Sequence, residues 1–332
     1  MQMKIRQGLL KPLLILAGVL LLVALFFVLL SHWESHYGKT DSDAFDSSDD
    51  GRLYLNDVCY APKKDLETIL LIGVDKFDNQ TQDSSYNNSQ QADFLMLLVM
   101  DMENKSCTAL HLNRDTMTEI PVLGVRGESA GSITGQLALA HTYGSGGADS
   151  CRNTLKAVKG LLYGQNIDHY VSFTMDAVGR VNDLAGGITL TMLDDLSSAY
   201  PEMQQGAAVT LTGDMALAYV RTRYGLEDSS NLRRMERQRQ YLTALYKAVS
   251  EKESSDETFL MKALETISAY MVSDCTVDQL SRLYDCWEAC ESKDFCTVDG
   301  VAEKGAEFME FYPDEAALKQ LVVDLFYTSV EE

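Results

Sequence analysis

Residues 68–74 have the sequence TILLIGV, an uncharged run that ends at Asp75. A short continuous apolar run of this kind is typical of a strand that is buried on both faces of a sheet. A second run, FLMLLVM at residues 94–100, begins directly after Asp93. Residues 107–112 follow after a short turn, so these two segments are predicted to form a hairpin. Charged residues stand at the ends of these strands, where loops commonly carry functional groups.

Strand and helix patterns alternate along the rest of the chain. Further strands are predicted at residues 169–174 and 188–192. Residues 124–147 are rich in glycine and are expected to form a loop with one short helix at 137–143. The other helices are predicted at 151–163, 176–184, 212–221, 231 onward, 259–272, 277–290 and 314–327. This alternation predicts a layered α/β fold with a mixed sheet.

The N-terminus has the pattern of a membrane anchor. Residues 1–12 carry three basic residues and no acid, and residues 13–30 are eighteen consecutive apolar residues. At about 1.5 Å per residue, such a helix nearly crosses a hydrocarbon core of about 30 Å. The basic flank precedes the run, which predicts a single-pass anchor in the cell membrane with a cytoplasmic N-terminus and an extracellular C-terminal domain. A cleaved signal peptide is the alternative, but no small-residue cleavage site follows residue 30.

Two regions follow the predicted anchor. Residues 31–64 are polar and acidic and are expected to form an extracellular stalk with little fixed structure. Residues 65–332 contain no second linker of this kind, so they are expected to form one large domain with a helical C-terminal part.

The chain has seven cysteines, so at least one thiol is unpaired within a monomer. Cys286 and Cys290 are four residues apart on a predicted helix. The cysteines are expected to be small buried residues or to form a disulfide near the C-terminus. No spacing of histidine and cysteine matches a zinc site, and no cysteine has a histidine close to it in a catalytic motif.

Residues 221–240, RTRYGLEDSSNLRRMERQRQ, gather six arginines against three acidic residues. This segment has a charge of +3, although the whole chain has a formal charge of −21. The guanidinium group stays charged and offers a planar set of donors that fits phosphate oxygens. The segment is therefore a candidate anion site. The acidic net charge argues against nucleic acid as a partner.

A helical projection separates these arginines. Asn231 is a possible N-cap, and an apolar stripe follows at Met235, Leu242, Leu245 and Val249. Arg234 and Gln238 fall beside the stripe, one turn apart, which favours an anion site for this pair. The outer side is expected to be solvated and paired with acidic residues; it carries Arg233, Arg237 and Arg239.

Several motifs occur in a defined order: LLIGVD, LNRD, LAHTYGSGG, DHYVSF, LAGGI, LTGDMALAYVRTR and RMERQRQ. In this order, behind one predicted anchor, they resemble the LytR-CpsA-Psr family over residues 68–249. The resemblance implies an αβα sandwich with a central mixed β-sheet and a pocket for a lipid chain. It also implies a phosphotransferase that moves a glycopolymer, such as teichoic acid or capsule, from undecaprenyl pyrophosphate to peptidoglycan.

The resemblance assigns roles to individual residues. Asp75 and Asp93 match the acids associated with a Mg²⁺ ion. The pyrophosphate-binding residues are Arg114, Arg221, Arg223, Arg234 and Gln238, and the catalytic set is Arg114, Asp115, Arg221 and Arg223. The chain differs from the family pattern at Gln91-Ala92, Ser132 and Asn231.

Two questions stay open from the sequence. The sequence does not identify the base that accepts the proton of the attacking hydroxyl; Asp115 and Asp93 are candidates, and Asp115 alternatively forms a salt bridge with a neighbouring arginine. The alternative function is a non-catalytic surface module that binds anionic wall polymer or polyprenyl phosphate as a sensor or scaffold. The metal carboxylates favour the enzyme, because simple anion binding has less need of them.

Overall fold

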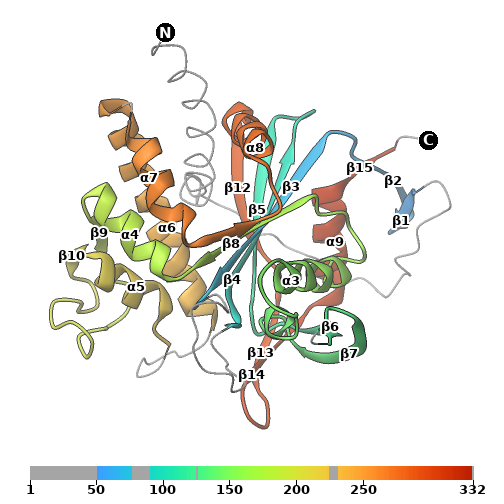
Figure 1. Ribbon diagram of the computed structural model, residues 1–332. Coiled ribbons are helices and arrows are strands. Elements are labelled where there is room, and N and C mark those ends of the chain that lie inside the picture. Colours follow the sequence, from blue (N-terminus) through green and yellow to red (C-terminus); the bar gives the residue numbers. More distant parts are fainter. Residues whose placement is uncertain (1–50, 77–89, 125, 224–230, 257, 331–332) are drawn as a thin grey trace.

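The computed structural model describes residues 51–76, 90–124, 126–223, 231–256 and 258–330 (Figure 1). A six-stranded sheet in the order β11-β8-β3-β4-β5-β12 forms its centre. The strands are β3 (Leu66–Val74), β4 (Ala92–Asp101), β5 (Ser106–Leu112), β8 (His169–Thr174), β11 (Met271–Ser273) and β12 (Ser292–Thr297). β4 is antiparallel to β3 and β5, whereas β8 is parallel to β3 and β12 is parallel to β5. The predicted buried strand, the hairpin and the mixed sheet are confirmed.

Helices cover both faces of this sheet, which gives three layers (Figure 1). Successive residues of β3 point to opposite faces. Ile69 and Leu71 pack against α4 (Asp176–Ala185), α5 (Gly213–Arg221), α6 (Asn231–Ser255), α7 (Phe259–Ser268) and α8 (Val277–Ala289). Leu70 and Ile72 pack against α2 (Leu139–Thr142), α3 (Gly147–Leu161) and α9 (Glu315–Phe326). Both faces are apolar because both are covered, which explains why residues 68–74 of the strand carry no charge.

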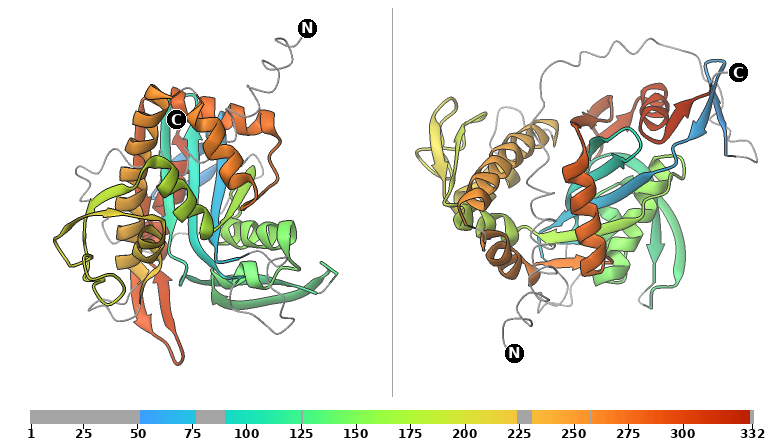
Figure 2. Two further views of the ribbon diagram at one scale, coloured as in Figure 1. Left: turned by 60° about the vertical axis from the view of Figure 1, so that its left-hand side comes forward. Right: turned by 90° about the horizontal axis from the view of Figure 1, so that it is seen from above.

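Smaller sheets surround the centre. β1 (Leu53–Leu55), β2 (Val58–Pro62) and β15 (Tyr327–Ser329) form one, and β9 (Ile188–Thr191) pairs with β10 (Ala208–Leu211). Two hairpins complete the set, β6 (Met117–Leu123) with β7 (Ser129–Gln136) and β13 (Gly300–Lys304) with β14 (Met309–Pro313), the second of which extends beyond the central sheet (Figure 2). The expectation that 124–147 is loop apart from one helix is therefore wrong, because β7 occupies 129–136.

The predicted stalk is partly structured. Residues 53–62, assigned to the stalk, form β1 and β2, and β2 pairs with β15 near the other end of the chain. Leu53 is fully buried and packs with Leu55 and Val323 of α9. The expectation of little fixed structure is wrong for this stretch, because its partner strand lies more than 260 residues away and leaves no local pattern. Residues 1–50, with the predicted anchor at 13–30, lie outside the described residues.

Within the part of the chain that the structure describes, no helix combines the length and the apolar character that crossing a bilayer requires.

The predicted helix at 259–272 ends earlier than expected, since α7 stops at Ser268 and residues 271–273 join the sheet as β11. β11 pairs with β8 in antiparallel register. The backbone hydrogen bonds of this edge strand outweigh its helical periodicity.

One disulfide joins Cys107 of β5 to Cys290 at the C-terminal end of α8. Cys290 lies near the C-terminus as expected, but its partner is 183 residues away in the central hairpin. The five other cysteines of the described residues are unpaired: Cys59, Cys151, Cys275, Cys286 and Cys296. The expectation of at least one unpaired thiol is confirmed.

Candidate functional site

Three strands of the central sheet bring the predicted acids and the first arginine to one edge. Asp75 directly follows β3, and Asp93 is the second residue of β4. These strands are antiparallel, with Val74 opposite Ala92, so the two aspartates become neighbours despite the long intervening segment. Arg114 comes two residues after the end of β5, which runs antiparallel to β4 and ends at the same edge.

Asp93 is bonded by two buried arginines. One Oδ1 atom accepts hydrogen bonds from Nη1 of Arg114 and, at 3.1 Å, from Nη1 of Arg234. Arg234 also donates to the backbone carbonyl of Asp93 at 3.2 Å. Burial raises the pKa of Asp93, but the two guanidinium groups outweigh it, so the net pKa is lowered. Asp93 therefore stays ionised and fixes the positions of both arginines.

Asp115 continues this network toward Arg223. Its side chain is 3% exposed, and its two oxygens lie 3.4 Å from Nε of Arg114 and 3.2 Å from Nη1 of Arg223. Gln136 of β7 donates to the first oxygen at 2.9 Å. These contacts support the salt-bridge interpretation of Asp115. They also explain why this acid can be buried, since a buried carboxylate needs charged or polar partners.

Asp75 differs from the other two acids. Oδ2 accepts a hydrogen bond from Nη2 of Arg221 at 2.6 Å, whereas the buried Oδ1 has no hydrogen-bond partner among the described residues. Burial, followed by the nearby charge of Asp93, raises the pKa of Asp75. An unpartnered buried carboxylate oxygen close to a second carboxylate is what a divalent cation would satisfy. The residues thus fit a magnesium ion held by Asp75 and Asp93.

α6 supplies the remaining residues. It begins at Asn231, the expected capping residue, and the side chain of Asn231 accepts from Arg234 and donates to Asn113 at 2.7 Å. Gln238 donates to the backbone carbonyl of Val220 at 3.1 Å, and its buried Oε1 has no hydrogen-bond partner in the described part of the chain. The projection that placed Arg234 and Gln238 beside the apolar stripe is confirmed.

The projection is wrong for Arg237, which was expected on the solvated side. Arg237 is fully buried, pairs with Asp194, and donates to the backbone carbonyls of Tyr219, at 2.9 Å, and Thr222. Asp194 follows β9, so α6 is covered on this side as well. A helical projection that assumes one buried face predicts that the opposite side of the helix is exposed. It therefore cannot show that a second side of α6 is buried.

The other two outer arginines behave differently from each other. Arg233 pairs with Asp194 at 2.8 Å and with Glu236, as expected for that side of the helix. Arg239 instead lies with its guanidinium carbon 4.6 Å from the ring centre of Phe295 in β12. The expected acidic partner is thus replaced by a cation–π contact.

The structure adds residues that sequence reasoning did not assign to the site. Gln91 accepts a hydrogen bond from Nη2 of Arg114, at a position where the family pattern has arginine. Asn113 accepts from Asn231 and from the backbone N–H of Asp115. Ser132, another departure from the pattern, lies exposed in β7. Sequence reasoning could have found Gln91 and Asn113 because they lie close to Asp93 and Arg114 at strand ends.

An apolar pocket opens beside this charged cluster. Its lining includes Gly73, Phe94, Val220 and Gln238, which are close in sequence to Asp75, Asp93, Arg221 and Arg234 respectively. The rest of the lining is mostly apolar, with hydroxyl groups only on Thr174 and Tyr241, and comes from Ile72 of β3, from β8, from α4 with the preceding Met175, and from α6.

Gly73 keeps the wall of this pocket close to β4. A Cβ atom at this position would lie 2.9 Å from Cβ of Phe94 and 3.3 Å from the terminal carbon of Met175. A larger residue would therefore push two lining side chains into the pocket.

The fold and the site define an α/β protein that presents arginines and carboxylates at a sheet edge, beside an apolar pocket. A family model described as the LytR_cpsA_psr family matches residues 31–322. The chain belongs to this family.

Curated relatives are distant. An uncharacterized protein of Staphylococcus aureus is 27% identical over 74% of this chain and 57% of its own length. A polyisoprenyl-teichoic acid–peptidoglycan teichoic acid transferase TagU of Halalkalibacterium halodurans is 30% identical over 54% of this chain and 52% of its own. The chain thus matches just over half the length of these two relatives. A protein of the same name from Bacillus cereus is 25% identical over 78% of this chain and 77% of its own length.

Solved structures share the fold. TagT bound to LI-WTA superposes with a TM-score of 0.57 at 21% identity and covers 80% of this chain and 91% of its own. TagV of B. subtilis gives a TM-score of 0.57 at 23% identity, over 79% of this chain and 96% of its own.

Proposed function

We propose that this protein transfers a teichoic acid-like or capsule-like glycopolymer from a polyprenyl pyrophosphate carrier to peptidoglycan. The observation that carries the proposal is that the arginine–aspartate cluster lies beside an apolar pocket. A polyprenyl pyrophosphate has the same two-part chemistry, an anionic head on an apolar chain. The names of the TagU and TagT relatives support this donor and acceptor.

The pocket would hold the first part of the lipid chain. Most of the lining consists of aliphatic and aromatic side chains, which suit an apolar lipid chain. Each buried CH₂ group would contribute about 0.8 kcal/mol to binding. Gln238, at the boundary between the pocket and the arginines, would donate to or orient the phosphate nearest the lipid.

The arginines would bind the pyrophosphate. Four arginines face three aspartates in the cluster, which leaves it with one positive charge before any metal binds. Arg221 is about half exposed and is held by a single carboxylate oxygen, so it can turn toward a phosphate at low cost. Arg114 and Arg234 are buried and fixed by Asp93. They provide preorganised donors that stabilise charge on the phosphates as the bond to the leaving lipid phosphate breaks.

Asp75 and Asp93 would hold a magnesium ion, which neutralises phosphate charge and orients the pyrophosphate when bound. The chemistry is then the attack of a peptidoglycan hydroxyl on the glycan-linked phosphorus. A new phosphorus–oxygen bond forms, the bond to the lipid phosphate breaks, and the hydroxyl proton passes to a base. Asp93 and Asp115, the candidate bases, each contact two arginines, so their first role is to position guanidinium groups.

The test supplies the full-length protein in detergent with a lipid-pyrophosphate glycan and peptidoglycan oligomers, and follows covalent attachment by mass spectrometry. Transfer that requires Mg²⁺ is expected. Absence of transfer with several donor lipids, in a protein that still binds polyprenyl phosphate, would favour the non-catalytic binding module instead.

Asp75→Asn is expected to lower both magnesium affinity and transfer by roughly tenfold or more, because a neutral amide is a weaker magnesium ligand of the same size. Asp93→Asn is expected to be more severe, since Asp93 also holds two arginines. The matched control is Asp149→Asn, because Asp149 is a partly exposed acidic residue on α3. Transfer that persists undiminished in EDTA, or in the Asp75→Asn/Asp93→Asn double variant, would refute the metal assignment.

The proposal includes a single-pass anchor at residues 13–30 with the domain outside the cell, where peptidoglycan lies. Protease added to intact protoplasts is expected to digest the domain. Protection of the domain in intact protoplasts, with digestion only after lysis, would reject this topology.

A further inference from the structure

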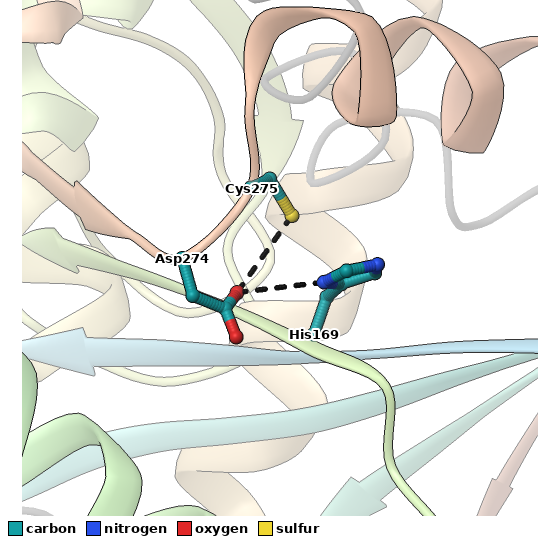
Figure 3. Close-up of side chains that lie close together, drawn as sticks. All are labelled: His169, Asp274 and Cys275. Carbon is teal, nitrogen blue, oxygen red and sulfur yellow. Dashed lines mark hydrogen bonds and ion pairs between the residues drawn. The ribbon is translucent and has the colours of Figure 1, made fainter.

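Three side chains of types that can bind a metal ion converge where β8 begins and β11 ends (Figure 3). They are His169, Asp274 and Cys275, and one ligand atom from each lies within 4.8 Å of the others. His169 is the first residue of β8, and the other two residues link β11 to α8. The proposed function uses none of them.

The distances between these atoms are close to those between ligands of one metal ion. Nδ1 of His169 lies 3.7 Å from Oδ1 of Asp274, and Sγ of Cys275 lies 3.8 Å from the same oxygen. A nitrogen–oxygen hydrogen bond is ordinarily about 2.7–3.2 Å long, so the first contact is too long for one. Around a tetrahedral zinc ion with ordinary bond lengths, the corresponding separations are about 3.4 and 3.6 Å.

Nδ1 of the histidine also lacks a hydrogen bond. Nδ1 of His169 is buried and has no hydrogen-bond partner within the described residues, and the side chain is 13% exposed. A buried polar atom without a partner is costly, and such cases commonly mark a missing ion or water. Asp274 is 34% exposed, which leaves a route from solvent and a free position for a fourth ligand such as water.

The loop that carries two of the three ligands is already fixed. The backbone N–H of Tyr170 donates to Oδ1 of Asp274 at 3.0 Å, and Ser273 donates to the carbonyl of Tyr170 at 2.9 Å. Cys275 donates its own N–H to Ser273 at 3.0 Å. Thr276 then forms a capping box with Gln279 at the start of α8. These outer contacts orient the ligands before any metal binds, as they do in established metal sites.

This cluster lies at the opposite end of the sheet from the arginine–aspartate cluster. β8 is parallel to β3, with His169 opposite Ile69 and Thr174 opposite Val74. The five-residue step from His169 to Thr174 spans about 16 Å at ~3.3 Å per residue. A metal here is therefore separate from the magnesium that Asp75 and Asp93 would hold.

We propose that His169, Asp274 and Cys275 bind a zinc ion that ties the start of α8 to β8. Nitrogen, sulfur and carboxylate oxygen together favour zinc over magnesium or calcium, which prefer oxygen ligands alone. The ion would join the central sheet to the C-terminal helical part of the domain and stabilise the folded state, since the unfolded chain does not hold the three ligands together.

The test uses the full-length protein in detergent, without thiol reductants and after removal of metals by dialysis against a chelator. Zinc is titrated in competition with a chromogenic chelator, and cobalt is used as a spectroscopic probe. We expect a single zinc ion per chain, a thiolate-to-cobalt charge-transfer band, and a higher thermal unfolding midpoint with zinc. Cys275→Ser is expected to remove the band and lower zinc affinity by roughly tenfold or more.

Cys286→Ser is the matched control, because Cys286 is a half-exposed free cysteine on α8 outside the cluster. It is expected to retain the cobalt band and the zinc shift. Asp274→Asn provides a second variant with almost unchanged volume, so the assignment does not depend on one substitution. A charge-transfer band that survives in Cys275→Ser, or an unfolding midpoint that zinc does not move in the wild type, would overturn the proposal. Glycopolymer transfer with magnesium present is expected to persist in Cys275→Ser.

Discussion

Replacement of Arg234 by glutamine is expected to reduce glycopolymer transfer by roughly 100- to 1000-fold, the effect of removing one preorganised donor from a buried anion site. Arg234 is 3% exposed and is held by Asp93 and Asn231. Burial lowers its pKa to about 10, so it still carries its charge at neutral pH. Its buried Nε atom has no hydrogen-bond partner among the described residues and is free to meet a ligand.

The loss should arise in transfer and not in folding. Asp93 keeps Arg114 as a partner when Arg234 is replaced, so no isolated carboxylate remains buried. Initial rates at saturating donor measure the effect, with Arg152→Gln as the control. Arg152 is an exposed arginine on α3 that pairs with Asp149 and contacts Tyr170, away from the arginine–aspartate cluster. A rate within about twofold of the wild type in a folded Arg234→Gln protein would exclude Arg234 from the pyrophosphate site.

Asp194→Asn is expected to destabilise the domain by about 3 kcal/mol, the lower end of the cost of breaking a buried ion pair. Arg237 is 1% exposed at its side chain and pairs with Asp194, which also pairs with Arg233. The lower end applies because the backbone carbonyls of Tyr219 and Thr222 still accept from Arg237 after the substitution.

The thermal unfolding midpoint of the full-length protein in one detergent measures this loss, and a fall of several degrees is expected. Asp195→Asn is a close control, because Asp195 is the next residue and is exposed. It should leave the midpoint unchanged. Equal midpoints for Asp194→Asn and the wild type would mean that the Arg237–Asp194 ion pair contributes nothing measurable to the stability of the domain.

The central part of the fold could be predicted because its signals are local. The uncharged runs of β3 and β4 define buried strands, and the turn after β4 defines the hairpin with β5. The same signals placed Asp75, Asp93 and Arg114 at strand ends, so their convergence at one sheet edge followed from antiparallel pairing. Helical periodicity alone was sufficient to place Arg234 and Gln238 toward the core.

The missed features depend on contacts between distant segments. β1 and β2 are short segments, LYL and VCYAP, within a stretch that is polar and acidic overall. Their ordered structure depends on β15 and Val323 at the other end of the domain. β7 has the sequence SAGSITGQ and is largely exposed, so it has neither an apolar run nor clear alternation. The burial of Arg237 depends on Asp194, which lies 43 residues earlier in a loop without a distinctive pattern.

The disulfide between β5 and the end of α8 also determines when the cysteines can be oxidised correctly during synthesis. At ~5–20 residues per second, the 183 residues that separate Cys107 from Cys290 take about 10–40 s to emerge from the ribosome. Cys59, Cys151, Cys275 and Cys286 all precede Cys290 in the chain, so each is available to Cys107 before its native partner exists. Correct oxidation therefore has to wait for the last part of the nascent chain or be reached by thiol exchange afterwards. A nascent chain that ends before residue 290 lacks both Cys290 and β12, so it can form neither this disulfide nor the complete central sheet.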